Sequence, residues 1–175
     1  KNEYIPFEYT VKEVFDYLDT INDPEFPIYD DCKEHSYIDI EWYQEILKKV
    51  LEDKPKRVID VGSNLNQYGF LFANEGIEYI GIDCCIGIEC LEKEISIMQP
   101  IITDKIKFIH ANYEDVADYF KDDVIISCLC IGYLIPYNKV KAKRLIVNDL
   151  KDGKPTATEI SNKELEMIEV KDVKD

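Results

Sequence analysis

This 175-residue chain lacks long apolar runs and has fewer basic than acidic residues, and each of these features argues against a class of protein. No stretch approaches the ~18 consecutive apolar residues of a membrane-spanning helix, so we expect no membrane segment. The N-terminus is polar and acidic, unlike a secretory signal. Lysine and arginine total 21 against 36 acidic residues, which gives a formal charge of −15. A strongly acidic surface repels the phosphate backbone of DNA and RNA, so binding of nucleic acid by this chain is disfavoured.

The only cluster of basic residues in the sequence consists of Lys139, Lys141, Lys143 and Arg144. Charge runs of this kind are usually solvated faces of loops or strands, and we favour that interpretation. The alternative is a contact surface for an anionic substrate or for nucleic acid.

The spacing of the six cysteines matches neither a disulfide framework nor a metal site. They are Cys32, Cys84, Cys85, Cys90, Cys128 and Cys130. A chain that is 46% apolar and 33% charged builds a globular core without disulfides, so we expect reduced thiols and a cytoplasmic location. Cys84 and Cys85 are adjacent, and one residue separates Cys128 from Cys130, whereas two residues usually separate the paired ligands of a metal site. We therefore expect no bound metal.

Hydrophobic periodicity predicts one domain over residues 1–175, whose N-terminal part, 1–54, holds two helices and a loop. Apolar residues recur at helical spacing over 11–21 and over 40–50. Between them, residues 22–37 predict a long loop, and Asp39 would cap the second helix. Trp42 lies off the apolar stripe of that helix, where packing is the favoured role and lining a ligand pocket the alternative.

Residues 55–131 alternate short apolar runs with helical patterns, which predicts an α/β domain with a doubly wound, mostly parallel sheet. Strands are expected at 57–61, 78–82, 106–110 and 123–130, and helices at 65–74, 86–98 and 114–120. The C-terminal part, residues 132–175, is expected to be abbreviated. Its predicted strands are 143–150 and 165–170, with a turn at Asp152-Gly153.

The most informative motif is Asp60-Val61-Gly62 at the end of the first expected strand, with Asp83 at the end of the second. The turn after a parallel strand offers backbone N–H groups to a ligand, and an acid at the next strand tip can bind two ribose hydroxyls. The spacing therefore indicates a nucleoside-containing cofactor. A dinucleotide fingerprint needs glycines where this chain has Asn64 and Gln67, so it fits poorly. Asp60 suits a ligand ammonium group instead.

At these residues the chain resembles the class I, Rossmann-like S-adenosylmethionine-dependent methyltransferases, over about residues 40–150. Asp60-Val61-Gly62-Ser63-Asn64 aligns with the first motif of that family, and Asn64 and Asn66 replace its second and third glycines. The resemblance implies a sheet of usually seven strands and S-adenosylmethionine as the cofactor. Because Asn tolerates a positive φ, we expect this degenerate turn to persist around a narrower cofactor slot.

The resemblance also implies roles for individual residues along the cofactor. Asp60 would bind its ammonium group, and Gly62, Ser63 and Asn64 would border it. Asp83 lies at the position of the ribose-binding acid and Asn112 at that of the adenine partner. Cys84 and Tyr113 flank those two positions and would enclose the adenine ring.

The sequence does not identify a catalytic residue. His35, in the expected loop, is the better candidate for a base, and His110, at the tip of the third strand, is favoured as structural. The segment Ile135-Pro136-Tyr137 is only faintly similar to the tetrapeptide motif of amino-methyltransferases. Tyr133 and Tyr137 would line the mouth of a pocket.

The leading hypothesis is methyl transfer from S-adenosylmethionine to a small molecule or protein. A catalytically inactive methyltransferase-like binding or scaffold subunit is the alternative, because two motif glycines are missing and the C-terminal part is short. A nucleotide-binding oxidoreductase is disfavoured by the glycine spacing. The short C-terminal part suggests either a small open pocket or an oligomer or partner subunit that completes the pocket.

Overall fold

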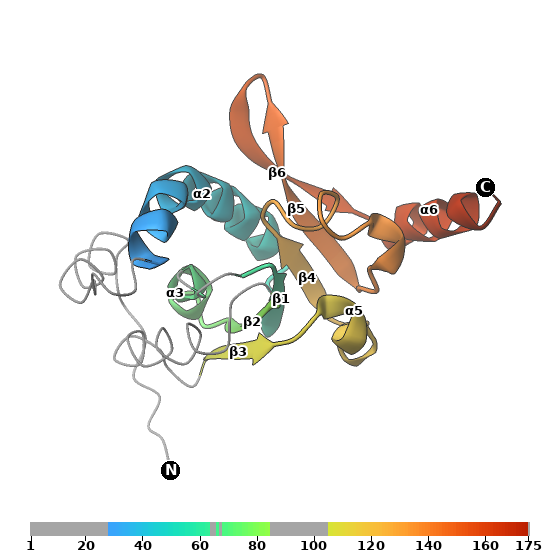
Figure 1. The fold of residues 1–175 in the computed structure, drawn as a ribbon, viewed down its shortest axis with the longest axis horizontal. Helices are drawn as coiled ribbons and strands as arrows, with labels where there is room; N and C mark the ends of the chain where they lie inside the picture. Colours follow the sequence, from blue (N-terminus) through green and yellow to red (C-terminus); the bar gives the residue numbers. More distant parts are fainter. Residues whose placement is uncertain (1–27, 64–65, 67, 85–104, 175) are drawn as a thin grey trace, which may run out of the picture.

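The structure, a computed structural model, describes residues 28–63, 66, 68–84 and 105–174. These residues form one six-stranded sheet with helices on both faces (Figure 1). The strand order is β3-β2-β1-β4-β5-β6, in which neighbours are parallel except for the antiparallel pair β5 and β6. The expected doubly wound, mostly parallel sheet is confirmed. The described part of the chain supplies six strands, where the resemblance implied seven.

The strands of the parallel sheet were largely predictable from the sequence. They are β1 (Arg57–Val61), β2 (Glu78–Asp83), β3 (Ile106–His110), β4 (Val124–Ser127) and β5 (Arg144–Lys151). The prediction of 123–130 for β4 was too long. Ser127 ends the strand by accepting the N–H of Ile131 on its Oγ at 2.8 Å, and Leu129 turns the backbone with a φ of 60°.

The helices differ more from prediction. They are α2 (Ile28–Leu51), α3 (Gly69–Ala73), α5 (Tyr113–Val116), the 3-10 helices η1 (Ala117–Phe120) and η2 (Tyr137–Lys139), and α6 (Asn162–Lys174). The expected loop was wrong over residues 28–37, and so was the cap at Asp39, because α2 includes both. The rest of that loop, residues 22–27, lies outside the described residues. The helices expected at 11–21 and 86–98 lie outside the described residues. Among the helices that the structure describes, none has the length and apolar character to cross a membrane.

The C-terminal part forms a hairpin and a helix, so the strand predicted at 165–170 was wrong. β6 (Lys154–Ile160) follows β5 through Asp152-Gly153, and both turn residues have a positive φ, as a tight hairpin turn requires. Ser161 then starts α6, because its Oγ accepts the N–H of Glu164 at 3.1 Å and the Glu164 carboxylate lies 3.2 Å from the same hydroxyl. This capping pair marks a helix in the sequence.

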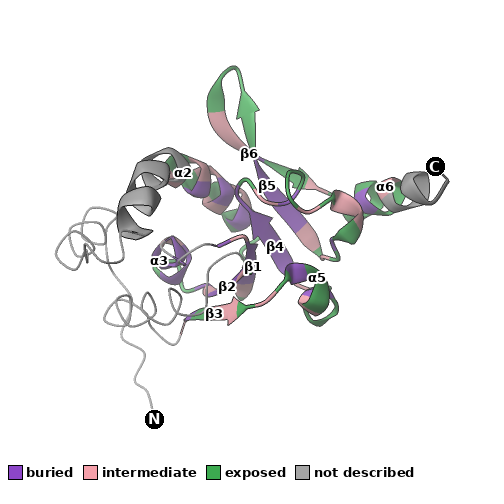
Figure 2. Ribbon diagram, viewed as in Figure 1, coloured by how far each residue is buried: buried purple, intermediate pink, exposed green. Residues whose placement is uncertain are grey.

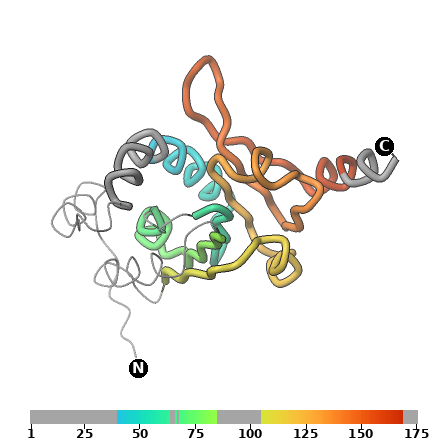
Figure 3. The backbone as a smooth tube through the Cα atoms, viewed as in Figure 1, coloured from blue at the N-terminus to red at the C-terminus, as the bar shows by residue number. Residues whose placement is uncertain are grey.

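Two apolar clusters pack against opposite faces of the sheet (Figure 2). One joins α2 and α3 to the sheet through fully buried residues such as Ile46, Val50 and Phe72. The other lies under α5, η1 and η2 and includes Phe120 and Leu145. Figure 3 traces the chain from the sheet into the β5–β6 hairpin, which projects from the body of the domain. Sheet strands covered on both faces explain the nearly continuous apolar runs of the sequence.

Two members of the basic cluster make structural contacts. Arg144 donates to the carbonyls of Lys49 and Asp53 at the end of α2 and pairs with Glu159 on β6 at 2.7 Å. Lys141 pairs with Asp118 at 2.6 Å. The three lysines of the cluster are exposed, as expected of a solvated face, whereas the Arg144 side chain is only 12% exposed and joins α2 to β6. Trp42 packs against the apolar cluster of α2 and α3, which supports the favoured packing role.

Candidate functional site at the carboxyl ends of the strands

Asp60 is a fully buried carboxylate inside the central strand β1. Its Oδ2 accepts hydrogen bonds from the hydroxyls of Tyr43 on α2, at 2.7 Å, and of Tyr79 on β2. Among the described residues, its second oxygen, Oδ1, has no hydrogen-bond partner. A buried acid without full pairing is costly, so its retention here points to a functional role.

The two tyrosines that hold Asp60 are themselves fixed by ring stacking. Tyr43 stacks on Tyr68 with ring centroids 4.5 Å apart, and Tyr79 stacks on Phe72 at 5.6 Å. All four rings are buried. The orientation of the Asp60 carboxyl is therefore set by two elements, α2 and β2, that pack against β1 from different directions.

Burial raises the pKa of Asp60 from 3.8 to about 7, although hydrogen bonds from Tyr79 and Tyr43 oppose the increase. The charge of Asp83, at the end of the adjacent strand, contributes to the increase. Burial followed by the Asp60 charge raises the pKa of Tyr43 and Tyr79 well above the usual value, so both hydroxyls remain protonated donors. Asp60 and Asp83 are thus close enough to interact.

The turn after β1 folds back onto β2 at Gly81, the register partner of Asp60. Asn66 adopts a positive φ of 57°, in agreement with the expectation that Asn sustains this turn. Its Nδ2 donates to the Lys107 carbonyl at 2.9 Å, so its Oδ1 is directed at Gly81. A Cβ at position 81 would collide with this Oδ1 and with Ser63 Oγ. Both oxygens are buried and have no hydrogen-bond partner among the described residues.

Gly62 occupies a crowded position with a φ of 81°. A Cβ here would lie 2.6 Å from Cβ and 2.9 Å from Sγ of Cys130, in the segment after β4. The N–H groups of Gly62 and Ser63 both donate to the Ile82 carbonyl, at 2.8 and 3.3 Å. The glycine is therefore required by close packing of the chain. Asn64 lies outside the described residues.

The residues expected on the adenine side lie at the tips of β2 and β3. Asp83 ends β2 opposite His110, and exposed Cys84 follows it. Asn112 caps α5 by accepting the Glu114 N–H on its Oδ1 at 3.2 Å. Tyr113 is buried in the second apolar cluster, and its hydroxyl accepts a hydrogen bond from the backbone N–H of Lys141 at 3.2 Å. That contact favours a packing role for Tyr113.

The histidines and the loop aromatics belong to other elements than Asp60. His35 lies within α2, not in a loop, and its side chain is outside the described part of the structure. His110 is an exposed residue at the tip of β3. Tyr133 is exposed on the segment after β4, and Tyr137 packs its hydroxyl against Gly132. Among the described side chains, the Asp60 carboxyl accepts hydrogen bonds from Tyr43 and Tyr79, and neither is a histidine.

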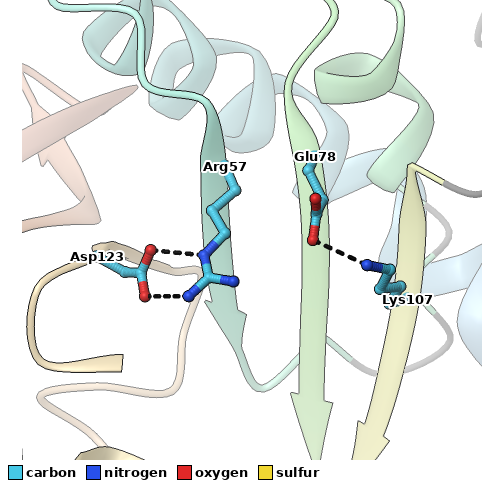
Figure 4. Close-up of polar contacts among 4 residues, drawn as sticks. All are labelled: Arg57, Glu78, Lys107 and Asp123. Atoms are coloured by element: carbon cyan, nitrogen blue, oxygen red, sulfur yellow. Dashed lines mark hydrogen bonds and ion pairs between the residues drawn. The ribbon is translucent and has the colours of Figure 1, made fainter. Parts of the chain in front are cut away.

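A cavity of about 460 Å³ opens at the opposite edge of the sheet, where the strands begin. Figure 4 shows two ion pairs at this edge: Arg57 binds Asp123 through two contacts of 2.7 Å, and Lys107 lies 3.2 Å from Glu78. Arg57 and Glu78 line the cavity. Ligands of open parallel sheets bind beyond the carboxyl ends of the strands, so this cavity is not the predicted site.

No three His, Cys, Asp or Glu side chains of the described residues are grouped as a metal would require. Sequence reasoning predicted a role for Asp60 and Ser63, which stays a prediction, and did not single out their neighbours Tyr43, Tyr79 and Gly81 or the side-chain oxygen of Asn66. Tyr79 and Gly81 are alternate residues of β2, the strand that pairs with β1, and this alternation was the sequence signal for both. Tyr43 lay on the apolar stripe of its helix and was interpreted only as core.

Comparison with known proteins identifies structural relatives alone. Neither a family model nor a curated protein matches the chain in sequence. A crystal structure of an MtNAS variant in complex with S-adenosylmethionine aligns with a TM-score of 0.51 and 12% identity, over 82% of this chain and 58% of that one. The PH0226 protein from Pyrococcus horikoshii OT3 aligns with a TM-score of 0.50 and 15% identity, over 77% of this chain and 80% of that one.

The glycopeptide N-methyltransferase MtfA aligns less well, with a TM-score of 0.45 and 10% identity. This chain spans about three fifths of the MtNAS chain, since the alignments cover 58% and 61% of it. At such low identity the likeness shows the fold and no more. The fold of this chain is that of the Rossmann-like, class I methyltransferases.

Proposed function

We propose that the carboxyl edge of β1, β2 and β3 binds S-adenosylmethionine and that the protein transfers its methyl group to a small molecule or a protein. The observation that supports this most is the pair of carboxylates at neighbouring strands. Asp60 keeps one unpaired, buried oxygen, and Asp83 lies near enough to raise the pKa of Asp60. MtNAS, which has the same fold, binds S-adenosylmethionine.

The residues fit this cofactor in two respects. In this proposal the unpaired oxygen of Asp60 would accept a hydrogen bond from the ammonium group, and Asp83, at the tip of β2, would accept hydrogen bonds from ribose hydroxyls. Gly62, Ser63 and Asn64 would border the methionine part. On the adenine side we assign Asn112 as the polar partner, with Cys84 and Tyr113 adjoining it.

When bound, the cofactor would supply a methyl group on a positively charged sulfur. A nucleophile of the substrate would displace the thioether, so that a bond to the methyl carbon forms as the carbon–sulfur bond breaks. The contribution of this chain would consist mostly of positioning. The exposed apolar residues Leu129, Tyr133 and Leu134, on the segment after β4, are where we expect a substrate or a partner subunit to pack.

The alternative function is a methyltransferase-like subunit without catalysis. The contact of Cys130 with Gly62 favours it, because it fills space that the first motif glycine normally leaves to the cofactor. The N–H groups of Gly62 and Ser63, already bonded to the Ile82 carbonyl, favour it as well. We also propose a cytoplasmic protein, since Cys84, Cys128 and Cys130 occur as thiols and not in disulfides.

Isothermal calorimetry with S-adenosylmethionine and with NAD distinguishes these functions. We expect micromolar binding of S-adenosylmethionine alone and a loss of at least about tenfold in Asp83→Asn, which removes a charged hydrogen-bond acceptor. Asp123→Asn, at the opposite edge of the sheet, serves as the matched control and should bind normally. Binding of NAD alone would support the oxidoreductase, and binding of neither would support the inactive subunit.

A further inference from the structure

The segment after β4 rests on the glycine that follows β1. We call residues 129–135 the cover segment. Its Cys130 occupies the space of a side chain at position 62, because a Cβ on Gly62 would lie 2.6 Å from the cysteine Cβ and 2.9 Å from its Sγ. The N–H groups of Gly62 and Ser63 are meanwhile bonded to the Ile82 carbonyl, at 2.8 and 3.3 Å. In this structure the turn after β1 is therefore closed by contacts within the chain.

Two buried polar side chains hold the cover segment in place. Ser127, at the end of β4, accepts the N–H of Ile131 on its Oγ at 2.8 Å. Asn148, on β5, accepts the N–H of Leu129 on its Oδ1 at 2.7 Å. Both are buried, so they are well placed to bond backbone groups that water does not reach. The Cys130 carbonyl accepts three further N–H groups from the turn that follows it. The backbone is thus fixed on both sides of the cysteine.

The closed arrangement carries backbone strain next to Cys130. Leu129 has a φ of 60°, which side chains other than glycine, asparagine and aspartate rarely adopt. The leucine is 40% exposed, so burial of its side chain does not explain the conformation. The hydrogen bond to Asn148 holds it there. Strained residues that depend on surrounding contacts are typical of ligand clamps and switch regions.

We propose that the cover segment is an autoinhibitory element, which closes the cofactor site of the free protein and withdraws Cys130 from Gly62 when S-adenosylmethionine binds. This inference rests on the proposed function, because a cofactor against the turn after β1 needs the surface that Cys130 covers. Ser127 and Asn148 stabilise the closed position, and the strain at Leu129 favours the open one. The measured affinity is then the intrinsic affinity reduced by the fraction of open molecules.

Reversible closure and permanent packing predict opposite effects of a smaller residue at position 130. If Cys130 is permanent packing, a smaller side chain leaves a cavity and lowers stability, and ligand affinity does not rise. If the closure is reversible, the same change weakens only the closed form. The open fraction then increases, and the ligand binds more tightly.

The test measures the affinity of the full chain for S-adenosylhomocysteine by calorimetry in a graded series. Cys130→Ala removes Sγ, and Cys130→Gly removes both atoms that approach Gly62. We expect binding at least about threefold tighter in Cys130→Ala, and tighter still in Cys130→Gly. Cys128→Ala is the matched control, because Cys128 packs in the apolar cluster on the other face of the sheet. It should lower stability and leave affinity unchanged.

Two further variants should shift the closure in opposite directions. Asn148→Ala removes the acceptor of the Leu129 N–H, so it should open the cover segment and tighten binding. Leu129→Asn relieves the strain of the positive φ, so it should stabilise the closed form and weaken binding by about threefold. Hydrogen exchange of the Ile131 amide in the free protein adds a measurement without ligand. Exchange should be faster in Asn148→Ala and slower in Leu129→Asn.

Each outcome supports or overturns the inference. Binding in Cys130→Gly that is absent or weaker in the original chain supports it. Unchanged or weaker binding in both Cys130 variants would overturn it, while binding by the original chain keeps the proposed function. If neither the original chain nor any variant binds S-adenosylhomocysteine, the proposed function fails and the inference with it. Equal exchange of the Ile131 amide in the original chain, Asn148→Ala and Leu129→Asn would show that the segment has a single position, which also overturns the inference.

Discussion

The Tyr79 hydroxyl donates a hydrogen bond to Oδ2 of Asp60 across the central strand pair β1 and β2. Both residues are buried, and the ring of Tyr79 is stacked on Phe72. The contact thereby ties the ionisable group of the candidate site to the packing of α3 against the sheet. Ionisation of one carboxyl is linked to the stability of the domain and, in our proposal, to its ligand affinity.

Asp60→Asn should change how stability depends on pH. The folded-state pKa, about 7, is raised above the unfolded value of 3.8, so the folded protein binds more protons between these limits. The free energy of unfolding therefore decreases as pH rises through this window, by up to roughly 4 kcal/mol. Asparagine removes that penalty. In urea denaturation, the variant should gain stability relative to the original chain from pH 4.5 to pH 8, whereas a pH-independent difference would contradict the ionisation argument.

Gly81→Ala should destabilise the domain through a collision, not through backbone strain. The added Cβ would meet Asn66 Oδ1 and Ser63 Oγ, and we expect a loss of about 1–3 kcal/mol. Because Asn66 contributes the nearest atom, Asn66→Gly in the same chain should restore part of the loss. Additive losses in thermal denaturation of the double variant would show that the two residues are not in contact.

Gly62→Ala and Gly76→Ala separate backbone strain from crowding. Both glycines have a positive φ, 81° and 74°, so both substitutions carry the strain of that conformation, about 1 kcal/mol. Only position 62 is also crowded, by Cys130, while the space around position 76 is open. The unfolding free energy should consequently fall further in Gly62→Ala. Equal losses would mean that Cys130 does not press on the turn.

The Arg57–Asp123 pair should contribute to stability and not to the site. It is bidentate, with two contacts of 2.7 Å, and the Asp123 side chain is only 15% exposed. Asp123→Ala should lower the free energy of unfolding by about 1–2 kcal/mol, because Arg57 loses its charged partner. Ligand affinity should be unchanged. A loss of affinity in this variant would indicate that the two edges of the sheet are coupled.

The sequence predicted the parallel sheet well because the strands are buried on both faces. Their apolar runs, separated by turn residues, located β1 and β3 at their observed bounds and β2 to within one residue. The final helix was mistaken for a strand because residues 165–170, in its middle, alternate in polarity. The Ser161–Glu164 capping pair and the Asp152-Gly153 hairpin signal were the stronger indications.

Only those residues of the candidate site that belong to the first sequence motif could be predicted. Asp60 lies in β1 and Ser63 in the turn that follows it, and the family resemblance drew attention to both positions. Tyr43 approaches Asp60 from a helix 17 residues earlier, and Tyr79 from the adjacent strand. Such contacts depend on register and on how α2 packs, which single-sequence patterns do not contain. The unpaired oxygen of Asn66 likewise emerged only from its bond to Lys107.

A crystal structure of the full chain with S-adenosylhomocysteine tests the central claim most directly. We predict the ribose hydroxyls at Asp83 and the ammonium group within hydrogen-bond distance of Asp60 Oδ1. A ligand bound elsewhere, such as the cavity beside Arg57, or an amino-acid part that points away from Asp60, would contradict the account.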